Sequence, residues 1–254
     1  MIQSLFLAHG SPMTAIEDNE YTNFLSNLGQ SIKPKAIVIF TAHWESETLT
    51  ISSADTVYDT IYDFYGFPRE LYEIKYQAKG SSLIALKIQE KLTGNGIKVK
   101  KDTARGLDHG SWTLLKHLYP NADIPVVQIS VNASLPIKEQ VEIGKALQGL
   151  GQEDILIIGS GVTVHNLREV KWDQTTPDSW AVEFDEWLID TIKSRDMASL
   201  YNYKKLAPNA NLAVPTAEHF VPLFIALGSG NKVDPKVIYR SYELGNLSYL
   251  CLQF

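Results

Sequence analysis

Six histidines are the residues of this 254-residue chain whose type and placing could do chemistry: His9, His43, His109, His117, His165 and His219. His9 directly follows the apolar run Ser4–Ala8, and His43 directly follows the run Ala36–Ala42. His165 comes shortly after a third apolar run, Ile155–Ile158, beyond a glycine-containing loop. Neutral imidazole is the commonest protein ligand for zinc and non-haem iron, so histidines gathered in one place would form a metal site.

The three apolar runs are the elements that would position these histidines. Each is short and rich in β-branched or aliphatic residues, which is typical of a strand buried on both faces. In open α/β sheets, ligands bind in the crevice outside the carboxyl ends of the strands. A single histidine beside a strand is usually an ordinary polar residue. The shared position of His9, His43 and His165 favours a metal site at one edge of a sheet.

The other three histidines have different surroundings. His219 lies in a loop just before a predicted helix, Phe220–Leu227. His109 lies in the glycine-flanked loop Gly106–Gly110 beside an aspartate, which suits either a hydrogen bond that braces the loop or a mobile catalytic group. His117 lies inside a predicted helix and is expected to be a structural or surface residue.

Predicted strands alternate with predicted helices along most of the chain, which indicates an α/β sandwich with a mainly parallel or mixed sheet. The clearest helices are Glu20–Gln30, Ser81–Leu92, Ile137–Leu150 and Trp180–Lys193. No repeat, low-complexity segment or linker interrupts residues 1–254, which we expect to form one domain. The segment Thr56–Lys79 is dense in tyrosine and phenylalanine. It is expected to cross the surface, either as ordinary packing or as the wall of a pocket for a flat ring.

The amino-acid composition limits the kinds of binding partner and cellular location to expect. The net charge is -6 with no basic block, so neither nucleic acid nor an anionic membrane is expected as a main partner. Cys251 is the one cysteine, so no intrachain disulfide can form and a reducing, cytoplasmic location is expected. No apolar run approaches the roughly 20 residues of a membrane span. A P-loop, a dinucleotide fingerprint and a GxSxG nucleophile elbow are all absent.

Six motifs together resemble the class III extradiol ring-cleavage dioxygenases, and most of all their DOPA extradiol dioxygenase-like branch. They are His9-Gly-Ser-Pro, Thr41-Ala-His43-Trp44-Glu45, Ile61-Tyr-Asp-Phe-Tyr-Gly-Phe-Pro68, Gly106-Leu-Asp-His109-Gly-Ser-Trp112, Gly159-Ser-Gly-Val-Thr-Val-His165-Asn166-Leu167 and Pro215-Thr-Ala-Glu-His219. The motifs run in family order from residue 1 to about residue 230, and as a set they are specific.

The resemblance implies one divalent metal at an edge of a three-layer α/β/α sandwich. It implies that His9, His43 and His219 are metal ligands, and that His165 is a fourth ligand or an acid/base group. It implies further that His109 hydrogen-bonds the substrate or oxygen in the pocket. Enzymes of the protocatechuate type use two histidines and a carboxylate, so Glu218, which adjoins His219, stays open as the third ligand.

Ferrous iron held in this way would keep open positions for a bidentate catecholate and for O₂. A neutral histidine can take the second catechol proton and return it later. Zinc would occupy the same ligands but cannot pass electrons to oxygen, so a zinc-loaded protein would be a resting or substituted form.

The function expected from this resemblance is O₂-dependent ring cleavage of a DOPA-like catechol. One alternative is a metal-binding or partner-binding protein of the same fold without ring cleavage. Such a protein could lose His109 or His165, but this chain has both. The other alternative is a zinc hydrolase, with Glu45 or Glu218 as its general base.

Overall fold

An eight-stranded mixed sheet forms the centre of the computed structural model, which describes residues 1–230 and 234–254. Four parallel strands stand side by side in the order β5, β2, β6 and β1. Antiparallel neighbours flank this block on both sides and make the sheet mixed. From one edge to the other the strands are β4 (Val99–Asp102), β3 (Leu49–Ser52), β5 (Val126–Val131), β2 (Ala36–Glu45), β6 (Ile155–Gly161), β1 (Leu5–Ala8), β10 (Cys251–Gln253) and β7 (Lys236–Tyr239).

Residues of the central strands alternate between two hydrophobic cores, one on each face of the sheet. In β2, Ile37 and Ile39 belong to one core, whereas Val38 and Phe40 belong to the other. Successive side chains of a strand point to opposite faces, so a strand covered on both sides must be apolar at every position. This is why the buried strands are readable from the sequence as short apolar runs.

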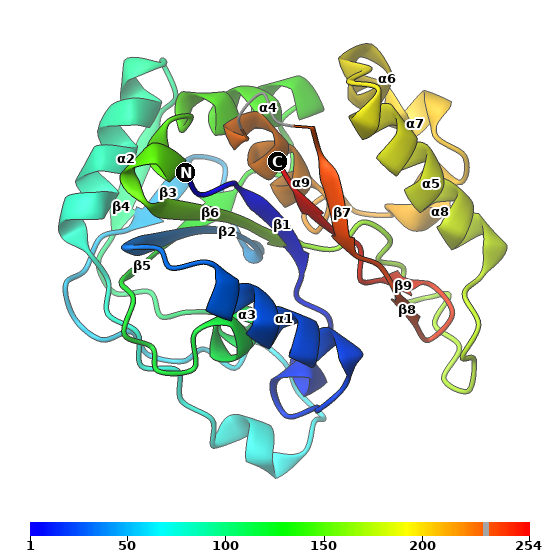
Figure 1. The fold of residues 1–254 in the computed structure, drawn as a ribbon, viewed down its shortest axis with the longest axis horizontal. Coiled ribbons are helices and arrows are strands. Elements are labelled where there is room, and N and C mark those ends of the chain that lie inside the picture. The colour runs from blue at the N-terminus through cyan, green and yellow to red at the C-terminus, as the bar shows by residue number, and fades with distance from the viewer. Residues whose placement is uncertain (231–233) are drawn as a thin grey trace.

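Helices cover both faces of the sheet and give the three layers that the sequence resemblance implies (Figure 1). One face carries α1 and α3, and the other carries α2, α4 and α9, with α5 to α8 packed beyond them (Figure 1). The α-helices are α1 (Glu20–Ser31), α2 (Ser82–Gly94), α3 (His109–Leu118), α4 (Ile137–Ala146), α5 (Ser179–Lys193), α6 (Met197–Tyr201), α7 (Tyr203–Leu206), α8 (Ala210–Ala213) and α9 (Val221–Ser229). Short 3₁₀ turns are η1 (Pro12–Ala15), η2 (Arg69–Tyr72) and η3 (Leu150–Glu153), and a separate hairpin pairs β8 (Tyr242–Glu243) with β9 (Leu247–Ser248).

Side-chain caps set the start of two predicted helices. Asn19 accepts a hydrogen bond from the Thr22 N–H, and the Thr22 hydroxyl oxygen accepts one from the Asn19 N–H, which completes a capping box at α1. The Ser81 hydroxyl oxygen accepts the Ile84 N–H at α2. Both helices therefore begin within a residue of the predicted start.

Two predicted placements in the sheet region are wrong. His43 was expected just past the end of its strand, but β2 continues to Glu45 and contains it. The pairing of β2 with β5 shifts register between Phe40 and Glu45, so the strand bends here without ending. His109 was expected in a loop, but it is the first residue of α3. Asp108 caps this helix through its main-chain oxygen, which accepts the N–H groups of Ser111 and Trp112.

The aromatic segment Thr56–Lys79 lies over the α1/α3 face and is tied down at several points. Tyr58 and Tyr76 are buried, and their hydroxyls donate to the Ser52 hydroxyl and to the Tyr119 carbonyl respectively. Main-chain bridges join Val57 to Lys79 and Thr60 to Leu107. Tyr58 and Tyr76 are therefore core residues, and these contacts hold the segment in place. Among the described helices, none combines the length and apolar character needed to cross a membrane.

Candidate metal centre

Five of the six histidines line one cavity of about 330 Å³ at the end of the central strands: His9, His43, His109, His165 and His219. His9 follows β1, His43 lies in the bent end of β2, and His219 comes just before α9. Potential ligand atoms of these three histidines all lie within 4.8 Å of one another. The structure thus brings His219, from far along the chain, to the edge where two strands deliver His9 and His43.

Each of these three rings has an oxygen acceptor beside its Nδ1 atom. His9 Nδ1 lies 3.0 Å from Ser160 Oγ, which itself donates to the Gly110 carbonyl and so keeps a lone pair for His9. His43 Nδ1 lies 3.1 Å from Asp63 Oδ2. His219 Nδ1 lies 2.9 Å from Glu218 Oε1.

These contacts favour a proton on Nδ1 in each of the three rings. An Nδ1–H that donates to oxygen leaves Nε2 as a free lone pair. The Nε2 atoms of His9 and His43 are 3.1 Å apart, so two such lone pairs face each other across a small gap. Oxygen partners of this kind orient metal-binding histidines and raise their basicity. The geometry fits a divalent cation between the rings.

Burial favours the uncharged form of His9 and His219. Burial lowers the pKa of His9 well below its ordinary value, and the neighbouring histidines, His43 first, lower it further. Burial likewise lowers the pKa of His219, against the opposing effect of Glu218. Metal binding requires neutral imidazole, so these rings need not release protons when a cation enters at neutral pH.

Glu218 lies beside the Nδ1 atom of His219, and it also belongs to a second group of possible metal ligands, with His165 and His219. Its carboxylate accepts from His219 Nδ1 and from the Thr216 hydroxyl, which lies 2.9 Å away. These hydrogen bonds outweigh burial and hold the pKa of Glu218 at about 2. Glu218 therefore occupies the side of the ring opposite to Nε2, as an orienting partner of His219.

His165 lies beside the three-histidine group without belonging to it. Its ring stacks on His219 with centroids 3.9 Å apart and planes 11° from parallel. Burial, reinforced by His219, lowers the pKa of His165 to about 3. The structure thus places a neutral, partly buried imidazole on the wall of the same cavity.

His109 completes the histidine wall from the start of α3. Its ring centroid is 3.9 Å from that of His43, and its Nδ1 lies 3.0 Å from Asp63 Oδ1. The same oxygen accepts the main-chain N–H of His109 at 3.0 Å. Asp63 therefore bridges two histidines, with Oδ2 toward His43 and Oδ1 toward His109.

Two acidic residues of the site were not identified from the sequence. Asp63 sits in the aromatic segment, far from any histidine in the chain, and no spacing pattern points to it. Asp108 is fully buried, and its carboxylate accepts from the Thr41 hydroxyl at 2.8 Å and from Arg105 at 3.3 Å. The Arg105 guanidinium also donates to the His43 carbonyl at 3.1 Å, so this network holds the main chain of His43.

Two glycines allow the close packing of the site. Gly10 has a φ of +64°, in the left-handed region that favours glycine, and it turns the chain directly after His9. A Cβ on Gly161 would lie 2.2 Å from the His219 carbonyl oxygen. That carbonyl accepts the Val162 N–H at 2.8 Å, so β6 and the His219 segment are in main-chain contact. The Gly159-Ser-Gly161 motif therefore serves close packing.

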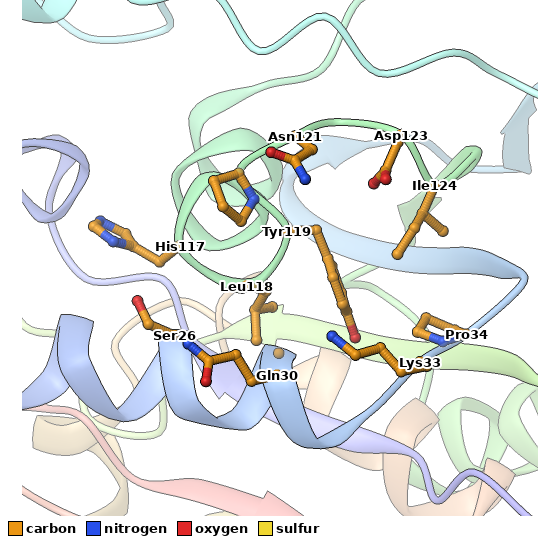
Figure 2. A pocket seen from close by; sticks show the side chains of 12 residues that line it. Ser26, Gln30, Lys33, Pro34, His117, Leu118, Tyr119, Asn121, Asp123 and Ile124 are labelled. Atoms are coloured by element: carbon orange, nitrogen blue, oxygen red, sulfur yellow. The ribbon is translucent and has the colours of Figure 1, made fainter.

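His117 lies elsewhere, as expected for a structural residue. Its Nε2 is 2.7 Å from the Thr14 carbonyl, at the edge of a second cavity of about 540 Å³ (Figure 2). Figure 2 shows this cavity between α1 and the end of α3, with the side chains of Lys33, Tyr119 and Asp123 around it. In the described part of the chain, every group of three possible metal ligands includes a histidine of the 330 Å³ cavity, and none includes His117.

Comparison with known proteins shows the family of this chain. Residues 3–251 match the family described as the catalytic LigB subunit of aromatic ring-opening dioxygenase. This chain belongs to the LigB family. The match spans nearly the whole given sequence.

Curated relatives are similar to this chain over almost their full length. A 4,5-DOPA dioxygenase extradiol from Beta vulgaris is 40% identical, with 99% of this chain and 96% of the relative covered. The protein of the same name from Escherichia coli (strain K12) is 39% identical, with 98% and 93% covered. A crystal structure of an uncharacterized Escherichia coli K12 protein superposes with a TM-score of 0.86 at 35% identity and covers both chains completely.

The LigB-family chain is therefore an extradiol ring-cleaving dioxygenase, an oxidoreductase. The family is metal-dependent, and the histidine cavity contains residues that could hold a metal ion. Its substrates are a small aromatic compound and O₂. The family and the α/β sandwich expected from the sequence are both confirmed, and the alternatives without ring cleavage are set aside.

Proposed function

We propose that this protein opens the ring of a DOPA-like catechol next to its two hydroxyls, with one ferrous ion bound by His9, His43 and His219. The observation that carries the ligand assignment is the convergence of these three rings, each with its Nδ1 beside an oxygen acceptor. The curated relatives named 4,5-DOPA dioxygenase extradiol support the substrate class.

The donor set suits ferrous iron and would also accept zinc. When bound, ferrous iron would supply open positions for a catecholate and O₂ and a path for electrons from the catecholate to O₂, whereas zinc would leave the protein in a resting form. The protein contributes three imidazole donors and the oxygen partners that hold their rings in place. The cavity volume of about 330 Å³ is at the small end of ligand pockets and fits a single ring.

His165 and His109 are the proposed catalytic residues. His165 is neutral at physiological pH and lines the cavity, so it is able to accept a catechol proton and return it after the ring has reacted. His165 is also proposed as a fourth metal ligand, because it stacks on His219 and forms a group of possible metal ligands with Glu218 and His219. His109 has Nδ1 beside Asp63, which leaves Nε2 to hydrogen-bond the substrate or O₂.

The aromatic segment provides the wall for a planar ring. Phe64 and Phe67 both line the histidine cavity, and the Phe64 ring meets the His109 ring edge to face with centroids 5.7 Å apart. An aromatic wall of this kind favours a flat substrate by offset or edge-to-face contact. The sequence suggested two roles for the aromatic segment, ordinary packing or the wall of a pocket. Its phenylalanines support the pocket wall, and its buried tyrosines support ordinary packing.

We also propose that residues 1–254 act as one catalytic domain and that the protein works in the cytoplasm. One central sheet carries the candidate ligands of β1 and β2 and lies between the two cores. The single cysteine, Cys251, is buried and unpaired, which suits a reducing compartment.

Activity tests this proposal directly. The protein is loaded with ferrous iron without oxygen, mixed with L-DOPA or another catechol, and then exposed to air. We expect a yellow semialdehyde product, because extradiol cleavage joins an aldehyde to a conjugated diene. The zinc-loaded protein is the control and should give none. Iron-loaded protein that forms no product across a panel of catechols would refute the proposed function.

A further inference from the structure

A third cavity, larger than the histidine cavity and distinct from the one beside His117, adjoins the histidine cavity. Its volume is about 990 Å³, and the two cavities share Ser11, Phe67, Leu167 and Leu247 as lining residues. We call this 990 Å³ space the outer cavity. A substituent on a catechol ring in the histidine cavity would therefore have an adjoining space, three times larger, into which to extend.

Much of the outer cavity wall is apolar and accessible. Leu167 and Trp172 line it and are 65% and 80% exposed, which is unusual for large apolar side chains in a folded protein. Met13, Leu244 and the shared Phe67 add further apolar surface. Such a wall suits the carbon skeleton of a substrate side chain.

The charged groups of the outer cavity are all acidic. Glu17, Asp173 and Glu243 line it, and neither cavity is lined by a lysine or arginine in the described residues. Glu17 and Glu243 take part in no salt bridge among residues 1–230 and 234–254. Two partly buried carboxylates thus face the route to the metal centre with no cation to balance them.

Glu243 lies where the two cavities meet. Its Oε2 accepts the hydroxyl of Tyr249 at 2.8 Å, and Tyr249 is a buried residue that lines the histidine cavity. Glu17 is near enough to feel this charge: burial raises the pKa of Glu17, and the repulsion from Glu243 raises it further. A cation close to a carboxylate favours its ionised form.

We propose that the outer cavity binds the side chain of the catechol substrate and that Glu17 and Glu243 bind a cationic amine on that side chain. The inference rests on the proposed function and narrows its substrate class. A catecholic amine gains two partners of opposite charge. The carboxylate of a propionate side chain gains no lysine or arginine partner among the lining residues and is repelled, so catechols that carry a carboxylate and no amine are poorer substrates.

Three catechols with side chains of similar length separate the charge effect from the effect of size: dopamine, 4-ethylcatechol and 3,4-dihydroxyphenylpropionate. With the iron-loaded protein, we expect kcat/KM for dopamine to exceed that for 4-ethylcatechol about tenfold, as one hydrogen bond to a charged group would give. The propionate should fall below 4-ethylcatechol. Equal values for the three compounds would overturn the inference while leaving ring cleavage intact.

Variants assign the effect to the two carboxylates. Glu17→Gln and Glu243→Gln should each reduce the dopamine to 4-ethylcatechol ratio severalfold, and two separate variants guard against the loss of the Tyr249 contact in Glu243→Gln. Asp18→Asn is the matched control, because Asp18 is exposed beside Glu17 and does not line the outer cavity. A ratio that stays high in both glutamine variants would overturn the inference.

A binding measurement keeps the inference independent of turnover. Titration of zinc-loaded protein, which cannot react with O₂, should show tighter binding of dopamine than of 4-ethylcatechol, and Glu17→Gln should remove the difference. This result would support the amine site even if no catechol were cleaved by the iron-loaded protein. Equal binding of the two compounds would overturn the amine site.

Discussion

Asp63→Asn is the substitution that tests the tautomer argument most directly. The native carboxylate has Oδ2 at 3.1 Å from His43 Nδ1 and Oδ1 at 3.0 Å from both the Nδ1 and the main-chain N of His109. Burial raises the pKa of Asp63, but hydrogen bonds from His109 and His43 outweigh it and hold that pKa well below its ordinary value. Asp63 is therefore an anion that lies beside both rings and accepts the main-chain N–H of His109.

An asparagine has the same shape but only one acceptor oxygen. If its amide nitrogen faces His43, the ring must accept at Nδ1 and carry its proton on Nε2, the atom that faces His9. If the nitrogen faces His109 instead, it opposes the main-chain N–H of that residue. Loss of an oxygen partner of this kind lowers metal affinity about 10- to 100-fold, or about 1.4–2.7 kcal/mol.

Competition with a chromophoric chelator measures the zinc affinity of each variant. Asp59→Asn is the matched control, since Asp59 is an exposed carboxylate in the same aromatic segment. His109→Ala keeps the contact between Asp63 and His43, so its metal affinity should fall less than that of Asp63→Asn. Native metal affinity in a folded Asp63→Asn protein would refute the argument that Asp63 sets the tautomer of His43.

Three further predictions concern the same cluster. His43→Ala should lower bound metal at least tenfold by elemental analysis, whereas His117→Ala should leave it unchanged; an equal loss in both would remove His43 from the ligand set. Gly161→Ala places a Cβ 2.2 Å from the His219 carbonyl oxygen, so it should cost about 1–3 kcal/mol of unfolding free energy and weaken metal binding. A native denaturation midpoint for Gly161→Ala would contradict the close packing. Below pH 6.5 the metal-free protein should lose stability, because the unfolded chain protonates His165 near its ordinary pKa while the folded pKa is about 3. The loss should approach about 1.4 kcal/mol per pH unit for this group, with a smaller slope in His165→Gln, and equal urea midpoints at pH 7 and pH 5 would count against a buried neutral His165.

The sequence by itself determined the class of fold and the family. Strands with both faces covered must be continuously apolar, so β1, β2, β5 and β6 are visible as short runs without any structural information. Local caps such as Ser81 fixed helix starts in the same way. Motif order along the chain was enough for the ring-opening dioxygenase family, because six motifs in sequence are far more specific than any one histidine.

Only the tertiary structure decided which histidines share a site and which oxygens hold them. His219 and Asp63 reach His43 from segments 176 and 20 residues away, and no local period records such a contact. The bend in β2 that keeps His43 within its strand depends on pairing with β5, which is equally non-local. Likewise, Glu218 and His219 are neighbours in the chain, but only their side-chain geometry shows that the carboxylate meets Nδ1 of the histidine. The sequence names residues that are able to bind a metal, and the packing of distant segments decides which lone pairs face one another.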